Sequence, residues 1–158
     1  MPHNKVYLLV VDDTEEFQLA LEYAASLARD NFGHIALLYV CEMPEVPQWG
    51  DIEKRMRREL YVEGERLLFM ASQKLWDLSK TYPVFYLEEG QSRTSVCADV
   101  IKRDPGISML VLASSAQASS PGPLVSYFMG KGHPSLTVPL TIIPGHMELE
   151  HQLGEVKE

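Results

Sequence analysis

The fold that we predict for this chain is centred on the segment Ile107-Ser-Met-Leu-Val-Leu-Ala-Ser-Ser-Ala116. Its centre, Met109 to Ala113, is an unbroken apolar run, and a loop of small residues follows it up to Ser126-Tyr127. Such a run is typical of a strand that helices cover on both faces, as in a parallel sheet. Ligands of these sheets bind past the carboxyl ends of the strands, where the amides of a small-residue loop can approach a phosphate. The segment therefore predicts a central parallel strand followed by a candidate ligand loop.

Strands and helices alternate on both sides of this segment. We expect strands at 5–11, 34–41, 83–87, 107–116 and 136–143, and helices at 15–31, 51–80, 92–103 and 124–129. Asp13 or Thr14 can cap the first helix, and Gly64 interrupts the second, where a bend is possible at a cost of about 1 kcal/mol relative to alanine. Strict alternation requires right-handed crossovers. The expected fold class is therefore α/β, a five-stranded, mostly parallel sheet with helices on both faces in a Rossmann-like three-layer arrangement.

Length and composition limit the possible classes of protein. The 158 residues, 46% of them hydrophobic, predict one domain at 1–145 and a polar tail at 146–158. The net charge of −8, without a basic stripe, argues against nucleic acid and anionic membranes as partners. Cys41 and Cys97 are expected to be buried free thiols in a reducing cytoplasm, with a disulfide between them as the open alternative. The apolar run at 6–11 is too short for a signal peptide, and no run is long enough to cross a bilayer.

Five motifs, in order along the chain, resemble the universal stress protein family. The first is Val10-Val-Asp-Asp-Thr-Glu-Glu-Phe-Gln-Leu-Ala-Leu-Glu-Tyr-Ala24, a strand, an Asp, a Thr and the start of a helix. The others are the segments 36–40, 87–90, 105–113 and 138–143. Each motif is weak alone, but five in the correct order are fairly specific. The resemblance covers about 5–144 and implies the adenine nucleotide alpha hydrolase-like form of the α/β fold.

The nucleotide-binding members of that family carry G-x2-G-x9-G-[S/T] after their fourth strand, and here the spacing remains without the residues. Ala113 and Ala116 stand at the first two glycines, Ser126 at the third, and Tyr127 at the Ser/Thr position. A β-carbon blocks close approach of the backbone to a phosphate and penalises a positive φ. We expect the ring of Tyr127 to lie where a small hydroxyl would meet the phosphates. Together the four substitutions argue against an ATP site of the family type.

The resemblance also implies which other residues border a vestigial or weak nucleotide site. Asp12, with Thr14 two residues later, matches the family acid near the adenosine, and Val40 matches a position whose backbone lies near the base. Small donors remain in the loop, so a shifted phosphate site around Gly122 stays open. The full set of expected site residues is Asp12, Thr14, Val40, Ala113, Ser114, Ser115, Ala116, Gly122, Ser126 and Tyr127.

The residues that could be catalytic lack the other residues that each type of reaction needs. The serines at 114–120 have no histidine at a strand end to activate them, and no G-x-S-x-G is present. Asp12-Asp13 resembles the acid pair of a response-regulator receiver, but the last strand lacks the lysine that such a site uses. The segment 11–14 also lacks the S-G-G-x-D-S-like loop of the related ATP-dependent alpha-hydrolases. We therefore expect no enzyme, no cofactor and no metal.

Two functions remain as expectations. The first is a non-catalytic stress-response module that acts as a homodimer, because family members often pair through the last strand. In this chain Val138, Leu140, Ile142 and Ile143 would carry that contact, and no other protein partner is predicted. The second is a regulatory switch in which ATP or AMP sits above the first and fourth strands and biases the loop at 121–127.

Overall fold

Five parallel strands form one sheet in a computed structural model, which describes residues 4–45, 50–116 and 119–147. The strand order is β3-β2-β1-β4-β5, and all four pairings are parallel. The strands are β1 (Val6–Val10), β2 (His34–Glu42), β3 (Val84–Gly90), β4 (Met109–Ala113) and β5 (Leu140–Ile143). The predicted α/β class with a five-stranded parallel sheet is confirmed.

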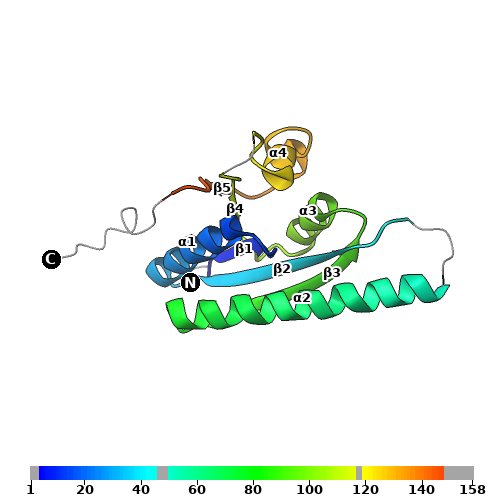
Figure 1. Ribbon diagram of the computed structural model, residues 1–158. Helices are drawn as coiled ribbons and strands as arrows, with labels where there is room; N and C mark the ends of the chain where they lie inside the picture. Colours follow the sequence, from blue (N-terminus) through cyan, green and yellow to red (C-terminus); the bar gives the residue numbers. More distant parts are fainter. Residues whose placement is uncertain (1–3, 46–49, 117–118, 148–158) are drawn as a thin grey trace.

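Helices connect the strands and cover both faces of the sheet (Figure 1). They are α1 (Glu15–Asn31), α2 (Gly50–Ser79), α3 (Arg93–Arg103), α4 (Pro123–Met129) and the 3₁₀ turn η1 (His133–Ser135). Side chains of β1 alternate between two cores: Tyr7 and Leu9 pack with α1 and α2, whereas Leu8 and Val10 pack with α3 and α4. This period of two places one apolar core on each side of the sheet.

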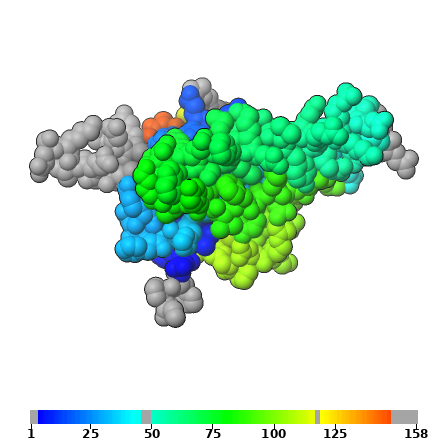
Figure 2. Space-filling view, turned by 90° about the horizontal axis from the view of Figure 1, so that it is seen from below, coloured from blue at the N-terminus to red at the C-terminus, as the bar shows by residue number. Residues whose placement is uncertain are grey.

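The long helix α2 runs through Gly64 without a break, and Gly64 itself is buried. A β-carbon at this position would lie 2.5 Å from the Tyr39 ring and 2.9 Å from the Leu87 side chain, so the glycine allows close packing of α2 on β2 and β3. The opposite face of α2 is open to solvent: Val62 and Phe69 are exposed. Figure 2 views the molecule from this side and shows α2 extending across the whole face.

The predicted strands at 107–116 and 136–143 extend well beyond the observed ones. β4 ends at Ala113 and not at Ala116, because the Ser115 amide leaves the ladder and donates to the Pro121 carbonyl at 3.1 Å. β5 begins at Leu140 and not at residue 136, since η1 and a bend precede it. Pro134 and Pro139 lack the amide hydrogen that a ladder needs.

The four residues of the expected dimer contact differ in position and exposure, and the contact itself stays a prediction. Val138 lies before β5 and is partly exposed, whereas Ile143 is only 2% exposed within the core. Leu140 and Ile142 are partly exposed on β5, which is an edge strand of the sheet.

The end of the folded part also differs slightly from the prediction. Met147 packs against the core on the α1–α2 side, two residues beyond the predicted boundary. The remainder of the predicted tail, 148–158, lies outside the described residues. No helix in the described part of the chain is long and apolar enough to cross a membrane.

Candidate functional site

A cavity of about 720 Å³ opens past the carboxyl ends of β1 and β4. The strand order reverses between these two strands, because the chain adds β2 and β3 on one side of β1 and then β4 and β5 on the other. This is the position at which open parallel sheets bind ligands. Apolar side chains form most of its wall: Val10, Phe17, Ala20, Val111, Leu112, Ala113, Pro121, Pro123, Leu124 and Val125. The remaining lining residues are Asp12, Thr14, Glu16, Arg93, Ser115, Ser120, Gly122 and Ser126.

The turn after β1 forms one side of this crevice and caps α1. Asp12 accepts through Oδ1 from the amide of Thr14 at 3.0 Å and from the Thr14 hydroxyl, and the Thr14 hydroxyl oxygen accepts from the Phe17 amide at 3.1 Å. Thr14 is the N-cap, and Glu15 and Glu16 occupy the first helical turn. A hydroxyl at this position satisfies a free helical amide, and carboxylates there interact favourably with the helix dipole. The predicted cap is confirmed, and the structure places both Asp12 and Thr14 in the crevice.

Arg93, the first residue of α3, enters the crevice from the other half of the chain. Its guanidinium lies 3.5 Å from Asp12 Oδ2 through Nη1 and 3.2 Å from Glu42 Oε1 through Nε. Arg93 is not among the predicted site residues, because it lies 81 positions from Asp12 in the sequence and only the strand order brings the two together. The local signal was a basic residue directly after the N-cap Ser92, where acids are usual.

The loop after β4 forms the opposite side, and its first three amides face protein acceptors. The Ser114 amide donates to the Ile143 carbonyl at 2.8 Å, and the Ser115 amide donates to Pro121. The Ala116 amide lies 3.5 Å from the Glu16 carboxylate. Gly145 packs behind this loop, where a β-carbon would lie 2.2 Å from the Ser114 carbonyl oxygen. These amides are therefore not free to receive a phosphate in this conformation.

The expected phosphate end of the site is assembled only in part. Ala113 and Ser126 line the crevice, and the Ser126 hydroxyl lies 3.4 Å from that of Ser120. Gly122 also lines it with a φ of 104°, a conformation that favours glycine. Ser114 and Ala116 are not lining residues.

The position of Tyr127 corrects the expectation, whereas the expected proximity of the Val40 backbone to a base stays a prediction. The Tyr127 ring packs over Gly132, where a β-carbon would lie 2.1 Å from it, and meets Phe128 edge-on at 5.0 Å. It belongs to the core on the α3–α4 side and does not line the crevice, so it does not fill the phosphate position. Val40 is 5% exposed in that same core and is likewise not a lining residue. A ring next to Phe128 gains more from packing there than from facing water.

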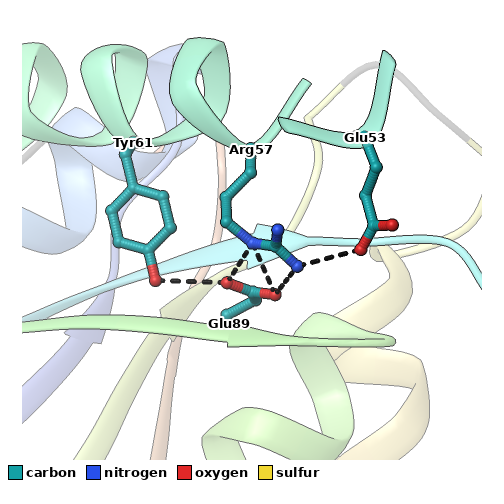
Figure 3. Close-up of polar contacts among 4 residues, drawn as sticks. All are labelled: Glu53, Arg57, Tyr61 and Glu89. Atoms are coloured by element: carbon teal, nitrogen blue, oxygen red, sulfur yellow. Dashed lines mark hydrogen bonds and ion pairs between the residues drawn. The ribbon is translucent and has the colours of Figure 1, made fainter. Parts of the chain in front are cut away.

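A second polar cluster, drawn in Figure 3, lies near the carboxyl end of β3 and joins that strand to α2. Arg57 donates to both oxygens of Glu89, at 3.0 Å from Nε and from Nη2, and to Glu53 at 3.1 Å. The Tyr61 hydroxyl donates to Glu89 at 3.3 Å. The Arg57 hydrogen bonds hold the pKa of the Glu89 carboxyl below its usual range. None of these four residues lines the crevice.

Reactive groups are scarce in the described residues. Cys41 and Cys97 are both free and buried, as expected, and burial raises the pKa of the Cys97 thiol to about 12, so it stays protonated and unreactive. No group of three or more His, Cys, Asp or Glu side chains in the described part of the chain is arranged to hold a metal. The arrangement suits binding of a small, largely apolar molecule with a few hydrogen-bonding groups.

Comparison with known proteins agrees with this geometry. The profile described as "Universal stress protein family" matches residues 3–124. The universal stress protein UspA from Lactobacillus plantarum superposes with a TM-score of 0.75 at 17% identity, over 90% of this chain and 99% of that one. A universal stress protein family member from Burkholderia pseudomallei gives 0.63 at 22% identity, over 91% and 98%.

Some of the structural neighbours are complexes with nucleotides. The universal stress protein from Archaeoglobus fulgidus in complex with dAMP has a TM-score of 0.57 at 12% identity, over 90% of this chain and 99% of that one. No curated protein matches the sequence significantly. At these identities the neighbours establish the fold.

Proposed function

The chain belongs to the universal stress protein family, and from that premise we propose a non-catalytic stress-response module that acts as a homodimer and does not bind ATP through the family's phosphate loop. The observation that carries the proposal is the loop after β4. Its amides at Ser114 and Ser115 are bonded to protein carbonyls, and the third, at Ala116, lies beside a carboxylate. A phosphate would have to displace these partners before it could bind.

The partners of the polar groups in the crevice support a non-catalytic function. Asp12 accepts from Thr14, the N-cap of α1, and pairs with Arg93, and Ser120 lies beside Ser126. Within the described residues no histidine hydrogen-bonds to a serine of the crevice, so a hydroxyl nucleophile lacks its base. The two buried free thiols suit a reducing cytoplasm as the site of action.

Thermal melting with and without Mg-ATP tests the nucleotide part. A ligand that binds only the native state adds about 2.7 kcal/mol of stability at one hundred times its Kd. We expect no shift of the melting temperature at millimolar ATP. A clear upward shift would instead support the switch, in which ATP or AMP occupies the crevice and biases the loop at 121–127; the open cavity of about 720 Å³ is the observation that favours this second function.

The dimer is proposed through β5, which is an edge strand with unpaired backbone groups on one side. Leu140 and Ile142 are partly exposed on this strand, and Met129 is exposed on the neighbouring α4. Pairing of β5 with its copy would satisfy the edge and bury these side chains.

Sedimentation of the full chain tests the dimer. We expect the wild type to be dimeric, Ile142→Lys to be monomeric with its cooperative melting retained, and Val84→Lys to stay dimeric, because Val84 lies on the opposite edge, β3. A monomeric wild type at micromolar concentration, or a dimer broken only by Val84→Lys, would reject the β5 interface.

A further inference from the structure

The charges that face the crevice are unfavourable for an anion. Three charged side chains line it, Asp12, Glu16 and Arg93. The Arg93 guanidinium is shared between Asp12 and Glu42, so its charge is already offset. No described ion pair involves Glu16. The crevice therefore presents an excess of negative charge, although it lies where parallel α/β sheets often receive phosphates.

Glu16 is also placed at the phosphate end of the crevice. Its Oε1 lies 3.5 Å from the amide nitrogen of Ala116, the residue at the second glycine position of the family motif. This distance is long for a hydrogen bond, so the inference rests on the position and charge of the carboxylate. α1 fixes that position, because Glu16 lies in its first turn, directly after the Thr14 cap.

We propose that Glu16 determines the ligand class of the crevice: its carboxylate takes the place of a ligand's phosphate, so the crevice accepts nucleosides, neutral or cationic at their 5′ end, and excludes nucleotides. This inference rests on the proposed absence of ATP binding and names its cause. The mostly apolar wall suits a base, and the hydroxyls of Ser120 and Ser126 line the crevice where they could meet a sugar. A phosphate next to Glu16 would place two negative charges against each other in a partly enclosed space.

The test uses three probes that differ only at the 5′ position: adenosine, AMP and 5′-amino-5′-deoxyadenosine. Calorimetric titration gives Kd values for the wild type and for Glu16→Gln, which keeps the shape of the side chain and removes its charge. We expect the wild type to bind AMP at least about ten-fold more weakly than adenosine, and the amine at least as tightly as adenosine.

The Glu16→Gln substitution should reduce the ratio of the AMP and adenosine Kd values by at least about ten-fold. Glu15→Gln is the matched control, because Glu15 is its neighbour in the first turn of α1, is exposed and does not line the crevice. That control should leave the ratio unchanged, and thermal melting of all three proteins verifies that each is folded.

The outcomes separate the two proposals. AMP binding by the wild type as tight as adenosine binding would overturn both this inference and the proposed loss of nucleotide binding. Exclusion of AMP that persists in Glu16→Gln would overturn the inference alone, since another feature would then reject the phosphate. Failure of all three probes to bind any of the three proteins would also overturn it.

Discussion

Two polar clusters lie near the carboxyl edge of the sheet, and one of them borders the crevice at β1 and β4, which no residue of the other lines. Near the end of β3, Arg57 of α2 donates hydrogen bonds to Glu89 of β3 and to Glu53 of α2. These bonds join the helix to the strand. At β1 and β4, Asp12 and Arg93 meet beside an open crevice. Charged residues at a strand end therefore do not make a site by themselves; unfilled space beside them does.

The two clusters differ in how closely the backbone of the neighbouring segment approaches the sheet. At the β3 end, Gly64 lets α2 pack directly on Tyr39 and Leu87, so side chains fill the interface. At the β4 end, the loop reaches α4 through Gly122, which has a positive φ. No atom lies within 4 Å of the position that a β-carbon at Gly122 would occupy, so the space beside it is open. Three substitutions test this contrast.

The largest effect is expected for Gly64→Val, which adds atoms to the filled side. Its β-carbon would lie 2.5 Å from the Tyr39 ring, so α2 must move away from the sheet. Overpacking of this kind costs about 3 kcal/mol of unfolding free energy. Urea denaturation measures the loss. Glu65→Val is the control, because it places the same residue at the adjacent exposed position of α2.

If Gly64→Val loses no more stability than Glu65→Val, close packing of α2 on the sheet would not be the reason for a glycine at this position, because valine has the higher helix propensity of the two. The cluster at β3 would then be no more tightly filled than the crevice, and the contrast would fail.

A smaller loss is expected for Gly122→Ala, on the open side. No atom lies within 4 Å of the added β-carbon, so the cost is conformational and comes from a φ of 104°. Such backbone conformations cost a non-glycine residue about 2 kcal/mol. Gly50→Ala is the matched control, since it is also unobstructed and has no positive φ. Equal stability of the two variants in urea would indicate that the loop relaxes freely.

The smallest effect is expected for Glu89→Gln, because water screens the partly exposed pair with Arg57. Hydrogen bonds from Arg57 lower the pKa of Glu89 in the folded state, so its contribution is present above the unfolded pKa of about 4.3 and is lost as pH falls through the folded pKa. The stability gap between wild type and variant should therefore close below about pH 4. Denaturation midpoints measured from pH 7 to pH 3 check this, and a gap that widens in acid would contradict the sign.

Much of the fold could be predicted because its signals are local. Thr14 caps α1 as expected, since a hydroxyl before an amphipathic run is sufficient to begin a helix. The apolar run at Met109–Ala113 is the buried central strand. Strand ends were less predictable: β5 starts at Leu140 because prolines and a 3₁₀ turn interrupt the apolar pattern before it.

Local sequence patterns were enough to predict the alternation of strands and helices, the parallel sheet and the edge at which a crevice would lie, because each depends on periodicity and caps within short segments. The side chains that face that crevice depend instead on how the whole chain folds. Arg93 meets Asp12 across 81 residues, Glu16 meets the Ala116 amide across 100, and the Tyr127 ring turns away to pack on Gly132. The physical reason is that strand order and side-chain packing, which bring distant residues together, leave no mark on the local pattern of a sequence.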